Sequence, residues 1–324
     1  MAENQNLPTQ QQGTQLSVQQ QNVMNFKKIL NGNFAQTQLK QVLKENAGSF
    51  AVSLMEVFTN DKQLQQCDPK AVFQEAVKAA SLKLPLNKQL GYGYIVVYNI
   101  WDKQLRRAIP TPTFIPGYRG YIQLAMRTGQ YRNINADVVY EGELRTTDKL
   151  TGAIDLNGDA KVDENGNSRV IGYFAHFELL NGFSKTLYMT KEQMASFALK
   201  YAAAYKPRKD FTPPTADQLI DMAQSQANNG PGNGVGWNGD YNAMATKTVL
   251  RHLLSKWGYL SIEMMNAIAM DEKEDFGSAE EIRDEENRAP RQTMNASQMI
   301  QDADATEVTE PEQQQPAPAE QPPI

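Results

Sequence analysis

The chain has 324 residues, of which 40% are hydrophobic, and it carries 32 Lys and Arg against 37 Asp and Glu, a formal net charge of −5. This length suits one large domain or two ordinary ones, and no apolar run approaches the ~18 residues that a membrane-spanning helix needs. The single cysteine, Cys67, excludes an intrachain disulfide framework and a cysteine-based zinc site.

The charge is distributed unevenly along the chain. From Asp271 to the end there are 15 acidic and 4 basic residues, which leaves 28 of the 32 basic and 22 of the 37 acidic residues in 1–270. A basic body indicates a polyanionic partner, and an acidic tail indicates a protein contact or self-masking. A tail that only keeps the protein soluble explains the same charges equally well.

Both ends have the composition of disordered segments. Residues 1–22 contain eight Gln and few aliphatic residues, and 271–324 include the run PEQQQPAPAEQPPI. Neither segment offers enough apolar surface to offset the entropy of ordering it. We therefore predict a disordered arm at 1–22, a folded domain at 23–270 and a disordered tail at 271–324. The Gln-rich start also lacks the layout of a signal peptide, so we expect no export by that route.

The first third of the chain is predicted to be helical. Apolar residues recur at helical spacing in 23–31 and 34–58. A further helix is expected from Pro69, with Asp68 as its cap.

Strand signals then alternate with helix signals. The segments 92–101 and 105–116 predict a hairpin, followed by a short helix at 117–129 that Gly129 ends. Three more strands are expected at 133–147, 169–180 and 183–190, the last two joined at Asn181-Gly182 by a type I′ turn.

Alternation in the middle strand of that group places Tyr173, Ala175 and Phe177 on a buried face and His176 on the other face. A helix capped by Thr190 follows. The fold class that results is α+β, a central antiparallel sheet flanked by helices.

Two motifs resemble ligand sites but lack the required context. Residues 234–239 spell G-x-G-x-x-G, yet they follow a helix end and breaker residues rather than the buried strand of a dinucleotide-binding turn. Residues 155–166 resemble a calcium loop, but Ala160 and Gly166 replace its required Gly and Glu. We interpret them as a flexible loop and a solvated hairpin tip, and expect neither cofactor nor metal.

The helix after the glycine-rich segment has one face of cations and hydroxyls. At 100° per residue, Lys247, Thr248, Arg251 and His252 share that face, opposite Val249 and its apolar neighbours. No carboxylate occurs from Tyr241 to Ile262, which indicates an external anion. An ordinary solvated face fits the pattern about equally well.

Further basic clusters are dispersed over about 150 residues. Dispersed clusters fit a long phosphate backbone better than a single phosphate, and Tyr118 lies beside one of them as a candidate for base stacking. Tyr121 and Tyr201, inside helices, are interpreted as core residues. The predicted DNA-contacting residues are Arg106, Arg107, Tyr118, Arg119, Arg127, Lys206, Arg208, Lys209, Lys247, Thr248, Arg251 and His252.

Several motifs together resemble the RecT family of phage single-strand annealing proteins. They are IPGYRGYIQLAMRTGQ, YMTKEQ, NGPG followed by a Trp, ATKTVLRHL and AMDEKE, in this order over roughly residues 25–275. Gly117, Tyr118 and Arg119 match the family's G-Y-R-G, and Lys247, Thr248 and Arg251 match its K-T-x-x-R. The glycine-rich segment departs from relatives, because it reads NGPGNGVGWNGD instead of moving promptly from NGP to Trp237.

The resemblance implies an ATP-independent recombinase that coats single-stranded DNA and anneals a complementary strand as a ring or helical filament. It also implies a strand-strand-strand-helix core, no catalytic residues, and work in the cytoplasm of a bacterial host. A phage exonuclease and the host single-strand binding protein are the implied partners.

Two other hypotheses stay open at this point. One is a nucleotide-dependent enzyme that uses the glycine-rich loop. The other is a structural interaction protein whose acidic tail binds partners while the basic body self-assembles.

Overall fold

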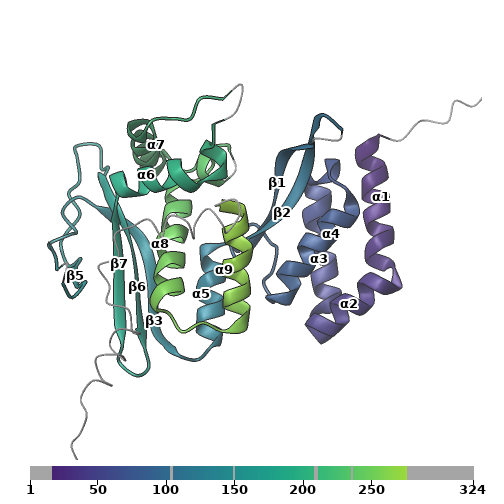
Figure 1. The fold of residues 1–324 in the computed structure, drawn as a ribbon, viewed down its shortest axis with the longest axis horizontal. Coiled ribbons are helices and arrows are strands. Elements are labelled where there is room, and N and C mark those ends of the chain that lie inside the picture. Colours follow the sequence, from purple (N-terminus) through teal and green to yellow (C-terminus); the bar gives the residue numbers. More distant parts are fainter. Residues whose placement is uncertain (1–16, 103–104, 149, 208–210, 235, 276–324) are drawn as a thin grey trace, which may run out of the picture. The chain divides into compact units, whose positions relative to one another are not determined.

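A computed structural model describes residues 17–102, 105–148, 150–207, 211–234 and 236–275, all within one compact unit (Figure 1). The fold is α+β, as predicted, with antiparallel sheets flanked by helices. Across the described ranges, no helix combines the length and the apolar character needed to cross a membrane.

Helices form the N-terminal part of this unit. They are α1 (Val18–Asn31), α2 (Asn33–Leu43), α3 (Ala47–Asn60) and α4 (Pro69–Ser81), with single 3₁₀ turns at Lys44–Asn46 and Leu64–Gln66. Asp68 caps α4 ahead of Pro69, as predicted. Phe26 of α1 stacks on Phe58 of α3 with ring centroids 4.1 Å apart, and both rings are fully buried. The segment 34–58 contains two helices, because the chain breaks at Lys44, whose φ is 51°.

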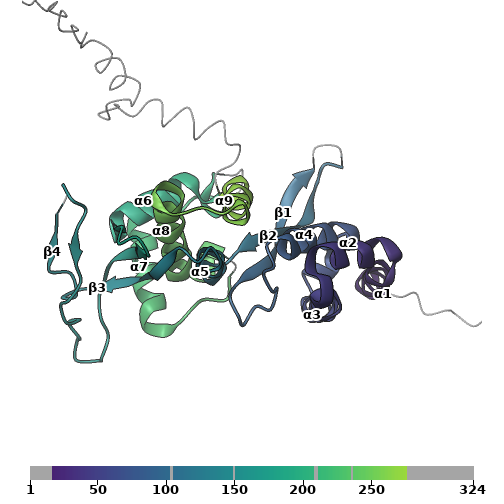
Figure 2. The same cartoon turned by 90° about the horizontal axis from the view of Figure 1, so that it is seen from below.

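A two-stranded hairpin follows the helices. Strands β1 (Gly93–Asp102) and β2 (Arg107–Pro116) pair antiparallel from Gly93 with Pro116 to Asp102 with Arg107. Helix α4 packs against β2 (Figure 2), and its Glu75 carboxylate accepts a hydrogen bond from the Phe114 amide at 2.9 Å. A helix side chain thus satisfies a backbone donor on the open edge of the hairpin.

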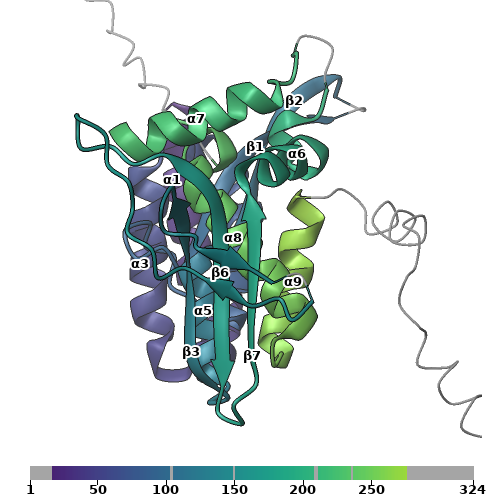
Figure 3. The ribbon, with the colours of Figure 1, turned by 90° about the vertical axis from the view of Figure 1, so that its left-hand side faces the viewer.

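A three-stranded sheet forms the second part. Its strands β3 (Tyr131–Tyr140), β6 (Val170–Leu179) and β7 (Ser184–Thr190) lie in the order β3-β6-β7, with α6 (Lys191–Tyr201) directly after β7 (Figure 3). This confirms the predicted strand-strand-strand-helix core. The two-residue strands β4 (Thr146–Thr147) and β5 (Ile154–Asp155) form a small separate hairpin between β3 and β6.

The middle strand has the predicted faces, but the turn after it differs from the prediction. Tyr173, Ala175 and Phe177 are buried, and His176 lies on the other face, where its ring bonds to Thr186 Oγ1 at 2.8 Å. In the turn only Gly182 has a positive φ, of 86°, so type I′ is wrong. The Leu179 amide bonds to the Phe183 carbonyl across a three-residue loop, and glycine takes the left-handed position that such loops require.

The remaining helices are α5 (Tyr118–Arg127), α7 (Ala216–Asn229), α8 (Tyr241–Trp257) and α9 (Ile262–Asp275). Helix α8 is central, because β3, β6 and β7 cover one side of it and α5, α7 and α9 pack on the rest (Figures 1 and 3). The fold extends past both predicted boundaries. Residues 18–22 of the expected arm lie in α1, and residues 271–275 of the expected tail lie in α9.

Two glycines let the first turn of α5 pack directly on the chain that enters β1. A β-carbon at Gly117 would lie 2.1 Å from the Gly91 carbonyl oxygen, and one at Gly120 would lie 2.2 Å from the Tyr92 carbonyl oxygen. Both distances are far below van der Waals contact, and the obstructing atoms are backbone. The two glycines of the G-Y-R-G motif are therefore required by packing.

Replacing Gly120 by Ala should lower the free energy of unfolding by about 2 kcal/mol or more, because the added methyl group overpacks a buried contact. The matched control is Gly48→Ala in α3, where an added β-carbon meets nothing within 4 Å. That variant should be neutral or more stable by about 0.5–1 kcal/mol, from helix propensity alone. Urea unfolding measures both values, and equal effects at the two positions would contradict the packing role of Gly120.

Candidate nucleic-acid interface

The first turn of α5 presents a cation among three tyrosines. Gly117 and Gly120 face the protein, so Tyr118 and Arg119 between them face outward, with Arg119 exposed and Tyr118 half-buried. Arg119 Nε donates to Tyr118 Oη at 3.3 Å, and the guanidinium carbon lies 5.9 Å from the centroid of the Tyr118 ring. We call Tyr92, Tyr94, Tyr118 and Arg119 the Arg119 cluster.

The tyrosines of β1 and of the chain before it complete this cluster. A β-carbon at Gly91 would lie 3.3 Å from Tyr94 Oη and 3.4 Å from Arg119 Cδ, so both side chains fold over Gly91. The hydrogen bond with Tyr118 raises the pKa of Arg119. Burial raises the pKa of Tyr94, against a smaller lowering by Arg119. The guanidinium is therefore charged and the Tyr94 phenol neutral at physiological pH.

The start of α5 also has the features of an anion-binding helix end. Its N-cap is Gly117, no side chain caps it, and no acidic residue lies in its first turn. Unbonded N–H groups and the helix dipole attract anions at such an end. Arg119 and the helix end thus favour the same kind of ligand, a phosphate.

A cleft of about 370 Å³ runs from Tyr94 along β1 to the glycine-rich loop. Its lining includes Asp61, Gln63 and Lys88, together with four glycines of the glycine-rich loop, Gly232, Gly234, Gly236 and Gly239. The glycine-rich loop follows helix α7 and not a strand, so the context of a dinucleotide-binding turn is missing. Trp237 of this loop is 4% exposed and packs edge-on against Tyr241 at 5.2 Å, which makes it a core residue.

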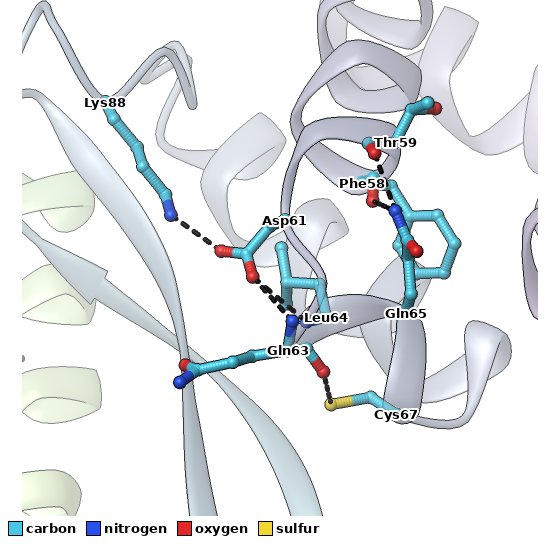
Figure 4. A network of polar contacts seen from close by, with 8 residues as sticks. All are labelled: Phe58, Thr59, Asp61, Gln63, Leu64, Gln65, Cys67 and Lys88. Carbon is cyan, nitrogen blue, oxygen red and sulfur yellow. Dashed lines mark hydrogen bonds and ion pairs between the residues drawn. The ribbon is translucent and has the colours of Figure 1, made fainter. Parts of the chain in front are cut away.

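Asp61, which lines the cleft, is the centre of a polar network (Figure 4). Lys88 Nζ lies 2.6 Å from Asp61 Oδ2, and the amides of Gln63 and Leu64 donate to Asp61 Oδ1. Partial burial raises the pKa of Asp61, but the bonds from Lys88 and the two amides outweigh it and lower the net pKa. Lys88 is thus a cation that is held at the rim by an ion pair.

Cys67 also belongs to this network, and its thiol donates to the Gln63 carbonyl at 3.6 Å (Figure 4). Burial raises the pKa of this thiol to about 11. Cys67 is therefore a protonated core residue at neutral pH, and it lacks the reactivity of a nucleophilic thiolate.

Eight of the predicted DNA-contacting residues lie outside α8. Besides Tyr118 and Arg119, the structure describes four of these eight. Arg106 and Arg107 are exposed at the turn of the β1–β2 hairpin. Arg127 is exposed, but its guanidinium donates to the carbonyls of Leu82 and Lys83 at 2.7 and 2.8 Å, where it holds the end of α4. Lys206 is half-buried. Arg208 and Lys209 lie outside the described residues.

The face of α8 that we expected to be exposed is buried. Lys247, Thr248 and Arg251 are only 4%, 2% and 3% exposed. Lys247 Nζ lies 2.6 Å from Asp271 Oδ1, and Arg251 Nη1 lies 3.3 Å from Asp271 Oδ2. The expectation of exposure was wrong because α5 and α9 cover this face, and the anion that it attracts is a carboxylate of the same chain.

His252 differs from the prediction in charge as well as position. Its ring packs edge-on against Phe197 with centroids 5.0 Å apart. Burial, with smaller contributions from Arg251 and Lys256, lowers the pKa of His252 to about 4. A neutral, half-buried imidazole offers no charge to a phosphate at neutral pH.

Comparison with known proteins identifies the family to which this chain is similar. The sequence matches the RecT family over residues 48–290. It is 35% identical over 268 residues to YqaK of Bacillus subtilis (strain 168), covering 83% of this chain and 76% of that protein. It is 28% identical over 211 residues to protein RecT of Escherichia coli (strain K12), covering 65% of this chain and 66% of that protein.

The chain therefore belongs to the RecT family, as its motifs predicted. Membership gives it a role in phage-type recombination and strand annealing. Family members are annealing proteins.

Sequence reasoning missed two groups of residues around the site. Tyr92 and Tyr94 read as strand residues, and only the contact between α5 and Gly91–Tyr92 brings them to Arg119. Asp271 was assigned to the tail, although the absence of carboxylates in 241–262 already indicated an anion from elsewhere. The acidic motif that ends the domain was the signal that could have identified it.

The lowered pKa of His252 predicts acid sensitivity. Its ordinary value is 6.5 and its folded value is about 4. Below pH 6.5 the unfolded imidazole gains a proton that the folded one does not, so stability falls as the pH drops toward 4. Between pH 7 and pH 5 the protein should lose about 2 kcal/mol of unfolding free energy through this group.

The measurement is urea unfolding at the two pH values for the protein and for His252→Gln, which removes the titrating group. The difference between the two proteins isolates the contribution of His252. An equal pH dependence in both would contradict the assignment.

Proposed function

We propose that this protein binds single-stranded DNA at the Arg119 cluster and anneals it to a complementary strand without ATP. The observation that carries the proposal is an exposed guanidinium flanked by half-buried tyrosines at an uncapped helix start. Arg119 and the helix end hold backbone phosphate, while the rings offer faces on which bases stack at about 1–3 kcal/mol each.

Arg106 and Arg107 extend this cationic surface. They lie at the turn of the hairpin whose other end carries Tyr94, so a strand that follows β1 meets cations at both ends. Phosphate contacts position the strand and leave the base edges to search for a complement. Base pairing then supplies the specificity, and the protein needs no catalytic residue.

The protein is proposed to act as an oligomer, a ring or helical filament, in the cytoplasm of a bacterial host. A phage exonuclease that exposes the strand and the host single-strand binding protein are the proposed partners. These details rest on family membership. The rival function is a nucleotide-dependent enzyme that uses the glycine-rich loop, which lines the cleft beside Tyr94. Protection of the protein from heat by ATP or NAD, with none by an oligonucleotide, would favour that rival.

Removing the Arg119 guanidinium should weaken DNA binding without unfolding the protein, because the side chain is exposed. For Arg119→Ala we expect affinity for oligo(dT) about tenfold lower and a log–log salt slope smaller by about 1. Fluorescence anisotropy across a salt series measures both quantities.

The matched control is Arg145→Ala, because Arg145 is an equally exposed arginine beyond β3. Its removal should change the affinity by less than about twofold. Equal losses for the two variants would show that binding depends on net charge and not on the Arg119 cluster.

The stacking role of Tyr118 is tested by a pair of substitutions. Tyr118→Phe keeps the ring and should bind oligo(dT) within about twofold of the unaltered protein, whereas Tyr118→Leu should bind about tenfold more weakly. Anisotropy gives the affinities, and thermal unfolding confirms that both variants fold. If Phe and Leu weaken binding equally, the hydroxyl matters and stacking does not.

A further inference from the structure

Three donors on two helices converge on a single carboxylate inside the protein. Asp271 Oδ1 contacts Lys247 Nζ at 2.6 Å, and Asp271 Oδ2 contacts Arg251 Nη1 at 3.3 Å and the Tyr121 hydroxyl at 2.9 Å. Lysine, arginine and hydroxyl donors are also the groups that bind phosphate oxygens. Tyr121, Lys247 and Arg251 thus form a site built for an anion, and Asp271 is the anion that fills it.

The donors and the carboxylate differ in how firmly they are held. Helix α8 is buried along most of its length, with ten buried residues. Among the side chains of α9 that the structure describes, 262–271, the buried ones are Met264, Ala267, Ile268 and Asp271, while Ile262 and Met265 are 70% and 48% exposed. Elements with few buried apolar contacts open at the lowest cost. The carboxylate can therefore leave while its donors stay in place.

An ion pair also adds little net stability to the packing of a helix. Removing two charges from water costs about as much as their attraction returns, so an apolar contact of similar size holds as well or better. A charged contact differs from an apolar one in that another anion can replace the carboxylate.

We propose that Tyr121, Lys247 and Arg251 form a second backbone-phosphate site, which Asp271 occupies in this state and from which DNA displaces it. The inference rests on the proposed function, since it needs a DNA-binding protein. Tyr121 lies two residues beyond Arg119 and hence on the opposite side of α5. The site is therefore separate from the Arg119 cluster, and a second strand would reach it during annealing once Asp271 is displaced.

Hydrogen exchange of the unaltered full-length protein tests the displacement directly. Exchange of the amides in 262–275 is compared in the free protein, with oligo(dT), and after oligo(dA) is added to that complex. We expect faster exchange in α9 after the complementary strand is added, with α7 as an internal reference that does not change. Exchange in α9 that is unchanged or slower in both DNA states would overturn the proposal.

Anisotropy of the same oligonucleotides keeps this result distinct from the proposed function. If oligo(dT) binds and α9 does not open, the second site is wrong and the Arg119 cluster stands. If no DNA binds, the proposed function itself has failed.

The displacement of Asp271 is also tested by the DNA affinity of a substituted protein. Asp271→Asn keeps the shape of the side chain and removes its charge, so the site should open more often and the apparent affinity for DNA should rise about tenfold. Glu263→Gln is the matched control, because it makes the same charge change at an exposed position of the same helix. A folded Asp271→Asn variant with unchanged or weaker binding would overturn the proposal, and if that variant does not fold, hydrogen exchange of the unaltered protein decides.

Discussion

The burial of α8 on all sides is the constraint on which the rest of the fold depends. The sheet β3-β6-β7 needs an apolar surface to cover one face, and α8, whose buried side chains include Val249, Leu250 and Leu253, packs against all three strands. The opposite side of the same helix carries Lys247, Thr248 and Arg251, and it is closed by α5 and α9. A central helix with one apolar and one cationic side requires an anion inside the protein, and Asp271 meets this requirement.

The same constraint explains where sequence reasoning succeeded and where it failed. Periodicity predicted the helices, the β1–β2 hairpin and the strand-strand-strand-helix core, because local spacing decides these elements. It also predicted the buried face of β6, on which Tyr173 and Phe177 lie. A helical wheel cannot tell water from a second layer of helices, so the polar face of α8 was read as exposed. Asp271, the carboxylate that pairs with this face, lies 24 residues after Lys247 and 20 residues after Arg251, outside the window of a helical wheel.

The G-Y-R-G motif combines two requirements in four residues. Its glycines allow α5 to approach the backbone at Gly91 and Tyr92, and its tyrosine and arginine use the orientation that this approach creates. Packing and recognition are therefore coupled, since a change that moves α5 away from β1 also separates Arg119 from Tyr94. The exposed arginines at the turn of the hairpin, Arg106 and Arg107, do not depend on the packing of α5 in this way. In the proposed function these arginines contribute charge alone, and this contribution should tolerate their exchange for lysine.

The burial of Asp271 changes where the folded domain ends. Composition places the boundary at 270, where the acidic segment begins, but the first residue of that segment is fully buried against α5 and α8. A chain shortened at 270 would keep Lys247 and Arg251 inside the protein and remove the carboxylate that both of them contact. The loss of Asp271 would then act as a core mutation, and a shortened protein that keeps this fold has to retain α9 through Asp275.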